Sequence, residues 1–387
     1  MARRGGRRIP LVVLLIESSR SSGRALLRGV ADYARHHGPW AFLWEPGGLE
    51  KARPRMRGLS ADGVIARDTE PVREVMRRGL PVVVFGHRHE AVPGVANVIT
   101  DSAAIGRMGA GHLLERGFRE FAYCGLPGAP WSESRGESFR GSVEGAGFRV
   151  HEFGSRGQRG EGQGGAEQRR MARWLEGLPK PVGVMACNDD VGERVIEACK
   201  LAGLRVPDEV AVLGADNDEL VCELSDPPLS SVAIGFERAG YESARVLHRM
   251  MAGRLAGGQR IVVRASGVVP RQSTDVLAMD DEQLVKGLRF IRQGGASAMR
   301  VDEVARASGL SRRVLEKRFR MRLGRSVLAE IRRVRVERIA RMLAETNLTV
   351  SQIALELGFE GVEHVARYFR RERGMTPLEF RRKCGGR

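Results

Sequence analysis

The strongest constraint on the fold is an alternation that runs from residue 10 to about residue 270. Stretches with apolar residues at helical spacing, at 22–37, 102–116, 190–202 and 236–252, separate short apolar runs. These runs are PLVVLLI (10–16), DGVIA (62–66), PVVVF (81–85), REFAYCG (119–125), VGVMAC (182–187) and EVAVLG (209–214). Strands that are apolar on both faces are typical of a parallel sheet covered by helices on both sides. The pattern predicts a doubly wound α/β unit over residues 9–275.

Two segments interrupt this alternation. GSRGQRGEGQGG (154–165) has the composition of a polar surface loop, and ASGVVPRQSTD (265–275) is expected to lead the chain out of the unit. The basic start before IPLVVLLI looks like a secretion signal, but Glu17 ends the apolar run and no small-residue cleavage site follows. A buried first strand is therefore the favoured interpretation.

The sequence indicates a cytoplasmic protein that has no contact with membranes. No apolar run approaches the ~18 residues that a membrane helix needs. The five cysteines are scattered and form no CxxC or Cys/His cluster, so we expect reduced thiols and no metal or other cofactor.

From about residue 281 the strand signal disappears and the charge rises. Residues 281–387 hold 25 lysines and arginines against 13 acidic residues, a net charge of +12 out of +17 for the whole chain. We expect these residues to form a second, all-α domain, which is suited to a polyanion such as nucleic acid.

This basic domain contains an internal repeat. Val304, Ala305, Gly309 and Leu310 recur 49 residues later as Ile353, Ala354, Gly358 and Phe359. Leu315, Phe319, Arg320, Gly324 and Ser326 recur 50 residues later as Val365, Phe369, Arg370, Gly374 and Thr376. The two halves are therefore predicted to have the same local structure. The offset grows from 49 to 50 residues because one residue is inserted between the matched segments.

Each half has the pattern of a helix-turn-helix. Alanine lets two helices approach, glycine four residues later provides the left-handed backbone that ends the first helix, and the next apolar residue closes the corner. Ser311 is suited to cap the second helix of the first copy. A long helix over about residues 327–344 is predicted to join the copies. Two recognition helices on one face of B-DNA would lie about one helical turn, ~34 Å, apart.

The second helix of each copy is expected to present a basic face to the major groove. Leu315 with Phe319, and Val365 with Phe369, would point inward. The residues expected to contact DNA are Arg312, Arg313, Glu316, Lys317, Arg320, Glu363, His364, Arg367 and Arg371. One copy alone fits a helical hairpin in a small bundle almost equally well. Two copies in register, both with basic outer faces, favour DNA binding.

On these motifs, residues 281–383 resemble the AraC/XylS family of bacterial transcription regulators. DEVARASGLSRRVLEKRFRMRLGRS and VSQIALELGFEGVEHVARYFRRERGMTPLEFRR match its two helix-turn-helix motifs. The resemblance implies that Arg313, Glu316 and Lys317 read bases in the first copy. It implies the same for Glu363, His364 and Arg367 in the second copy.

Polar side chains gather where predicted strands of the α/β unit end. Asn188, Asp189 and Asp190 follow one strand, Asp216 and Asn217 follow another, and Trp131 with Arg135 follows a third. Ligands of doubly wound folds bind at such strand ends. Carboxylates and guanidinium groups hydrogen-bond vicinal hydroxyls, and an aromatic face covers the C–H side of a sugar, so the set suits a small sugar.

Each of these residues also has a purely structural interpretation. Asn188 or Asp189 would cap the next helix, as Asp101 would cap another. Asp216 and Asn217 fit an ordinary turn, Arg135 a solvated helix residue, and Trp131 a core residue.

Residues 9–275 resemble the periplasmic-binding-protein-like sensor of LacI-type regulators. GRALLRGVADYAR, LGADNDEL, LSSVAIG and PRQSTD carry this resemblance. It implies that Arg135, Asp189 and Asp216 bind the sugar, with Asn217 adjacent, Trp131 nearby and residues 20–24 at the border of the cleft. The join of this sensor to the AraC-type domain, together with the same segments, resembles a sugar-operon regulator and implies D-xylose or a related pentose as the effector.

The two parts together predict a sugar-controlled transcription regulator rather than an enzyme. The expected partners are an operator in double-stranded DNA, a small sugar, a second copy of the chain in a homodimer, and RNA polymerase. Activation of sugar catabolism genes follows from the resemblance, with repression as the alternative. A sugar-processing enzyme would leave the basic repeat without a purpose, and a secreted receptor would need a signal peptide.

Overall fold

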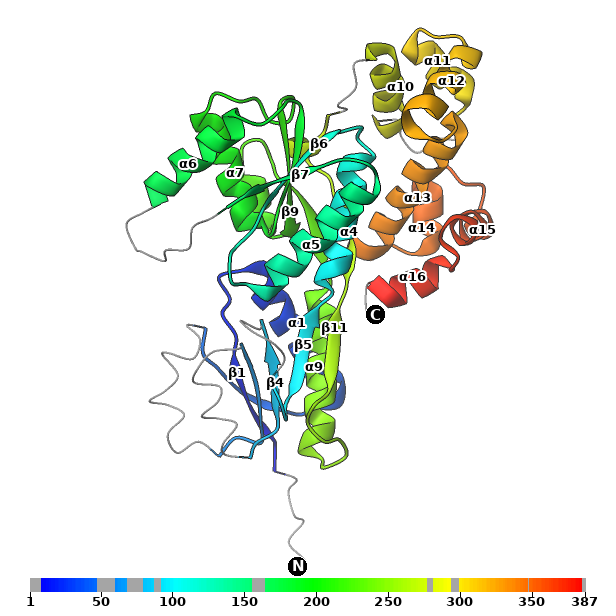
Figure 1. Ribbon diagram of the computed structural model, residues 1–387. Coiled ribbons are helices and arrows are strands. Elements are labelled where there is room, and N and C mark those ends of the chain that lie inside the picture. The colour runs from blue at the N-terminus through cyan, green and yellow to red at the C-terminus, as the bar shows by residue number, and fades with distance from the viewer. Residues whose placement is uncertain are drawn as a thin grey trace, which may run out of the picture.

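The computed structural model describes residues 8–46, 60–67, 79–86, 92–154, 164–276, 281–293, 299–346 and 348–384. Figure 1 shows two α/β lobes stacked on one another, with a helical body beside the second lobe. We call residues 8–276 the sensor unit and residues 281–384 the helical domain. Within the described residues, no helix combines the length and the apolar content needed to cross a membrane.

The first lobe is built on a parallel sheet in the order β11-β5-β4-β3-β1-β2. Its strands are β1 (Leu11–Leu15), β2 (Ala41–Trp44), β3 (Gly63–Arg67), β4 (Val82–Phe85), β5 (Ala96–Thr100) and β11 (Arg260–Val263). Helices α1 (Ser21–His37) and α9 (Phe236–Met251) pack against each other. They approach closely because a Cβ atom at Gly29 or Gly240 would overlap a backbone oxygen of the other helix.

The second lobe is built on a sheet in the order β12-β10-β9-β8-β6-β7. Its strands are β6 (Glu120–Cys124), β7 (Val150–Phe153), β8 (Val182–Ala186), β9 (Val210–Asp216), β10 (Ser230–Ile234) and β12 (Ala265–Val269). Its helices are α4 (Ser102–Leu114), α5 (Pro130–Gly145), α6 (Gly164–Glu176), α7 (Asp189–Leu201) and α8 (Glu219–Leu224). Only β12 runs antiparallel to its neighbour among the described strands.

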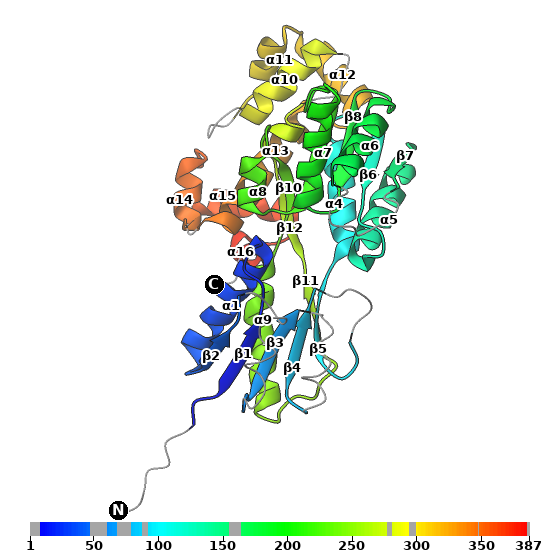
Figure 2. The ribbon, with the colours of Figure 1, turned by 90° about the vertical axis from the view of Figure 1, so that its left-hand side faces the viewer.

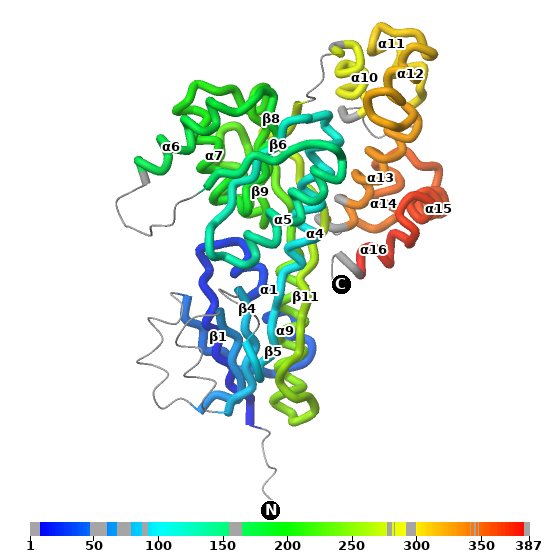
Figure 3. The backbone as a smooth tube through the Cα atoms, in the orientation of Figure 1, coloured from blue at the N-terminus to red at the C-terminus, as the bar shows by residue number. Residues whose placement is uncertain are grey.

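Three chain segments pass between the lobes, as Figures 2 and 3 show. They lie after β5, after β10 and between β11 and β12. Backbone hydrogen bonds hold the segments side by side, from Asp101 to Val263 and from Gly235 to Arg264. The lobes are thus joined by a narrow bundle of backbone, an arrangement that permits hinge movement.

The helical domain contains α10 (Glu282–Gln293), α11 (Val301–Ser308), α12 (Arg312–Leu323), α13 (Val327–Glu345), α14 (Val350–Glu356), α15 (Val362–Arg373) and α16 (Pro377–Cys384). Leu315 and Phe319 lie in one apolar core, and Val365 and Phe369 lie in another. Helix α13 contributes to both cores, so it joins two separately packed halves.

The predicted fold class is confirmed: two parallel-dominated sheets are followed by helices. All six apolar runs form strands, and the first run is the buried strand β1, as favoured. Gly309 ends α11 with φ +66°, and Ser311 caps α12, as predicted for the helix-turn-helix. The long joining helix is α13.

One expectation needs correction. Residues 265–275 do not merely leave the sensor unit, because residues 265–269 form β12, which pairs with β10. Most of the predicted polar loop at 154–165 lies outside the described residues, and its last two residues already belong to α6.

Candidate functional site

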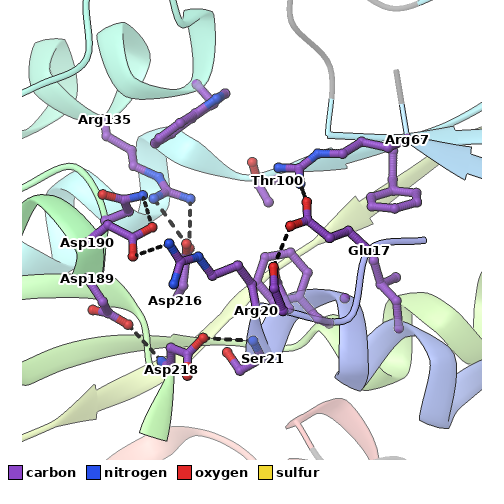
Figure 4. Close-up of a pocket in the computed structure, with 18 residues that line it drawn as sticks. Glu17, Arg20, Ser21, Arg67, Thr100, Arg135, Asp189, Asp190, Asp216 and Asp218 are labelled. Atoms are coloured by element: carbon purple, nitrogen blue, oxygen red, sulfur yellow. Dashed lines mark hydrogen bonds and ion pairs between the residues drawn. The ribbon is translucent and has the colours of Figure 1, made fainter. Parts of the chain in front are cut away.

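A cavity of about 380 Å³ lies between the two lobes of the sensor unit (Figure 4). It lies at the carboxyl ends of strands from both sheets, which is the usual ligand position in doubly wound folds. The lining residues are Glu17, Ser19, Arg20, Ser21, Ser22, Gly23, Leu26, Arg67, Phe85, Thr100, Trp131, Arg135, Asn188, Asp189, Asp190, Asp216, Asp218 and Phe236.

Arg135 is a buried cation that points into the cavity from the start of α5. Its side chain is 3% exposed, donates to the carbonyl of Cys187 and lies 3.4 Å from Asp216 Oδ1. The guanidinium also stands 4.9 Å from the centroid of the Trp131 ring, so it is held by a carbonyl, a carboxylate and an aromatic face. Among the described residues, its Nε has no hydrogen-bond partner. Burial therefore rules out a solvated helix residue at this position.

Asp216 and Asn217 end β9 with left-handed backbone, at φ +109° and +53°. Such angles are uncommon outside glycine and often accompany binding sites. Burial raises the pKa of Asp216, and the charge of Arg135 opposes that rise. Asn217 is not in the cavity lining: its amide oxygen accepts from Arg271 at 3.0 Å, and its backbone N–H donates to Ser231.

The sequence left open whether Asn188 or Asp189 caps the next helix and which of them belongs to the ligand site. The Asn188 side chain caps α7 by accepting from the Val191 N–H. Asp189 forms part of the cavity wall, but its carboxylate accepts from Ser231 Oγ at 2.5 Å and from the Asp218 N–H at 2.7 Å. Burial, together with the charge of Asp216, raises the pKa of Asp189 well above its ordinary value. Asp189 thus holds the loop after β9 in place.

Contacts across the cavity join the two lobes. Arg20 of the first lobe lies 2.9 Å from Asp190 of the second, and the Ser21 N–H donates to the Asp218 carboxylate at 2.8 Å. The Arg20 and Asp190 side chains are 52% and 33% exposed, so their attraction is weakened by water. A polar ligand can replace such a pair at little cost.

The first lobe contributes a polar pair that the sequence reasoning missed. Glu17 and Arg67 lie 3.5 Å apart, and Phe85 lines the same side. Glu17, Arg67 and Phe85 stand at or just beyond the ends of β1, β3 and β4, so the strand-end rule, applied to the first half of the chain, would have found them. Thr100, Asp218 and Phe236 were also missed. Two of these, Thr100 and Phe236, lie at crossings between the lobes.

The candidate DNA-contacting residues of α12 lie mostly on an open face. Arg312, Arg313, Lys317 and Arg320 are exposed. Glu316 is half-buried, and its carboxylate accepts from the Val327 N–H at 3.4 Å, so it also has a partner at the start of α13.

The candidate residues of α15 are similarly placed. Glu363, His364, Arg367 and Arg371 are exposed, and α15 itself lies on the side of the helical domain away from the sensor unit (Figure 1). His364 lies 3.3 Å from Glu360, and Arg371 lies 3.1 Å from its neighbour Glu372. Helices α12 and α15 therefore both present charged side chains to solvent in the folded domain.

Family models match both parts of the chain. Residues 110–274 match a periplasmic binding protein-like domain, and residues 304–383 match a helix-turn-helix domain. A ligand-sensor fold joined to a tandem helix-turn-helix defines the chain as a DNA-binding transcription regulator.

Some known proteins match nearly the whole length of the chain. The xylose operon regulatory protein of Escherichia coli K12 is 30% identical over 382 residues, which cover 96% of each chain. The structure of the xylose-binding transcription activator xylR has a TM-score of 0.61 at 29% identity and covers 97% of this chain and 98% of that one. A CelR–cellobiose complex has a TM-score of 0.56 at 25% identity and covers 69% of this chain and 85% of that one. The chain belongs to the family of xylose operon regulatory proteins.

Proposed function

We propose that the chain is a sugar-controlled regulator whose effector, D-xylose or a related pentose, binds in the cavity between the lobes. The meeting of Arg135, Asp216 and Trp131 at one wall of that cavity carries the proposal. The arginine and the carboxylate supply a donor and an acceptor for adjacent hydroxyls, and the indole ring offers an apolar face. The names of the relatives, a xylose operon regulatory protein and a xylose-binding activator, support the choice of sugar.

In this proposal, Arg135, Asp216 and Trp131 touch the sugar, while Asp189 and Asn217 set the position of the loop after β9. The DNA-contacting set is Arg312, Arg313, Glu316, Lys317, Arg320, Glu363, His364, Arg367 and Arg371. Glu316 combines this role with its contact to the start of α13.

The sugar acts by shifting a population of conformations. It bridges both lobes and favours one lobe arrangement, in which a homodimer presents its helix-turn-helix pairs to adjacent half-sites of an operator. The regulator works in the cytoplasm, activates sugar catabolism genes and contacts RNA polymerase. Repression is the second candidate. In that case the sugar-free conformation, rather than the sugar-bound one, binds the operator.

Calorimetric titration of the full-length protein with D-xylose, L-arabinose, D-ribose, D-glucose and cellobiose tests the effector. We expect a pentose to bind most tightly. The assignment would be rejected if only cellobiose bound saturably, or if none of these sugars bound. Operator binding with and without the tightest sugar then separates activation by improved binding from repression by release.

A further inference from the structure

The helical domain contacts both lobes of the sensor unit. Glu115, the residue after α4, belongs to the second lobe, where α4 packs on α5. Arg238, in the first turn of α9, belongs to the first lobe, where α9 packs on α1. Figure 1 shows α13 beside α4, and α16 near the level at which the lobes meet.

The contact at Glu115 is an ion pair with Arg333 of α13. The two side chains meet at 2.5 Å, and they are 35% and 21% exposed. The same guanidinium lies 2.8 Å from Glu330, which is fully buried, and 2.7 Å from Glu337. Three carboxylates thus share Arg333. Burial raises the pKa of Glu115, and the charge of Arg333 opposes that rise.

Helix α4 begins beside the cavity, and Glu115 follows its far end. Thr100 lines the cavity, and Asp101 caps α4 by accepting from the Ala104 N–H at 3.0 Å. At the other end of α4, buried Arg116 donates to the carbonyl of Thr274 at 2.7 Å, in the last turn of the sensor unit. A rigid helix therefore runs from the cavity to Glu115.

The contact at Arg238 also begins near the cavity. Its guanidinium donates to the carbonyl of Arg382 in α16. Phe236, two residues earlier in the same helix, lines the cavity. In each lobe, a helix that begins beside the cavity thus carries a residue that contacts the helical domain.

Because each contact belongs to a different lobe, the helical domain can keep both contacts in only one arrangement of the lobes. We propose that the Glu115–Arg333 and Arg238–Arg382 contacts form a clasp that converts movement of the lobes into movement of the DNA-binding helices. A hinge movement that changes the distance or direction between the two anchor points breaks or shifts at least one contact of the clasp, and so changes the position of α13. The clasp rests on the proposed function, since a sugar must drive the hinge.

The test measures how strongly sugar changes DNA affinity. Full-length wild type selects a duplex from a random pool, and the Kd of this duplex is measured with and without saturating D-xylose for wild type, Glu115→Gln, Glu115→Lys and Arg238→Ala. Glu337→Gln is the matched control, because it removes a carboxylate from the same arginine within the helical domain. Sugar affinity and thermal unfolding are measured for every protein.

We expect D-xylose to change the Kd of wild type and of Glu337→Gln by about tenfold, a typical coupling. The change should shrink to less than about twofold in Glu115→Lys and Arg238→Ala and be intermediate in Glu115→Gln, with unfolding temperature and sugar affinity in the absence of DNA preserved. An unchanged ratio in all three variants, with wild type responsive, would overturn the clasp alone. Failure of wild type to bind D-xylose or to respond to it would overturn the proposed function and the clasp together.

Discussion

At the scale of single residues, the cavity combines strained backbone with paired charges. Asp216 is held at φ +109° beside a buried arginine, and Gly23 lies so close to the Glu17 carbonyl that a Cβ atom would overlap it. Both conformations bring polar atoms to the cavity edge, as expected of a binding site.

Asp216→Asn should weaken sugar binding while the protein remains folded. Asparagine tolerates the left-handed backbone that alanine would strain, so the substitution removes mainly the charge. Loss of one charge-assisted hydrogen bond should reduce affinity by ~1.5–3 kcal/mol in calorimetry. Asp226→Asn, whose side chain is 87% exposed, is the control. Equal affinities of the two variants would remove Asp216 from the sugar site.

Arg313 and Arg367 should differ from Arg371 in what they contribute to DNA binding. If the first two meet base edges, replacement by alanine relaxes the preference at one base pair each, at a cost of ~1–3 kcal/mol. Arg371→Ala, if this residue meets phosphate, should weaken all sequences alike. Selection of duplexes from random pools measures both effects. Equal losses on selected and random DNA for all three variants would contradict the assignment.

At the scale of elements, strands with buried apolar faces were predictable and the others were not. Strands β2 and β7 lie at sheet edges and carry exposed residues. Strand β7 (VHEF) has no apolar run, and the short apolar run of β2 (AFLW) was not recognised as a strand. Strand β10 begins with Ser230 and Ser231, which are fully buried because Thr274, Ser273, Arg271 and Asp189 hydrogen-bond them. A buried strand that contains polar residues lacks an apolar run, because those residues form hydrogen bonds with partners far away in the sequence. No local pattern therefore predicts it.

Glu330 of α13 should stabilise the helical domain in a pH-dependent way. Burial tends to raise its pKa, but hydrogen bonds and charges from Arg333 and Arg325 outweigh burial and lower the pKa below the ordinary 4.5. Its contribution is therefore complete above about pH 4.5 and is lost as pH falls through the lowered value. Glu330→Gln should cost about 2 kcal/mol in denaturant unfolding at pH 7 and less in acid.

Glu337→Gln provides the comparison for Glu330, because it lies on the same helix and contacts the same arginine but is 45% exposed. It should cost only a few tenths of a kcal/mol. A penalty for Glu330→Gln that stays constant from pH 7 to pH 3 would show that the ion pairs are not its cause.

At the scale of the whole molecule, we expect DNA affinity and the response to sugar to reside in different parts. The helical domain has its own two apolar cores, and residues 281–387 hold +12 of the net charge of +17. Contacts at Glu115 and Arg238 join this domain to the lobes.

A fragment of residues 281–387 should bind duplex DNA without sugar. Log affinity should fall with log salt by about 0.9 for each phosphate neutralised, because counterions are released. The full-length protein should add a sugar dependence that the fragment lacks. Gel-shift titrations at two salt concentrations, with and without D-xylose, measure the salt dependence and the sugar dependence of DNA affinity. A fragment that fails to bind at low salt, or that responds to sugar itself, would contradict this division.

The sequence by itself determined the two parts of the protein, because their signals are local. Buried strands, amphipathic helices and the glycine that ends α11 are each specified within a few residues, and the repeat at 49–50 residues identified the tandem helix-turn-helix. The strand-end rule also located Arg135 and Asp216 in the cavity.

Only the tertiary structure decided which polar groups meet. It turned Asn217 toward Arg271, gave Glu316 a partner at α13, and placed Glu17 and Arg67 opposite Arg135. It also brought Glu115 to Arg333, 218 residues away. Such contacts depend on how two lobes and a third domain pack together. No local pattern records that packing, because each side chain by itself looks like an ordinary charged surface residue.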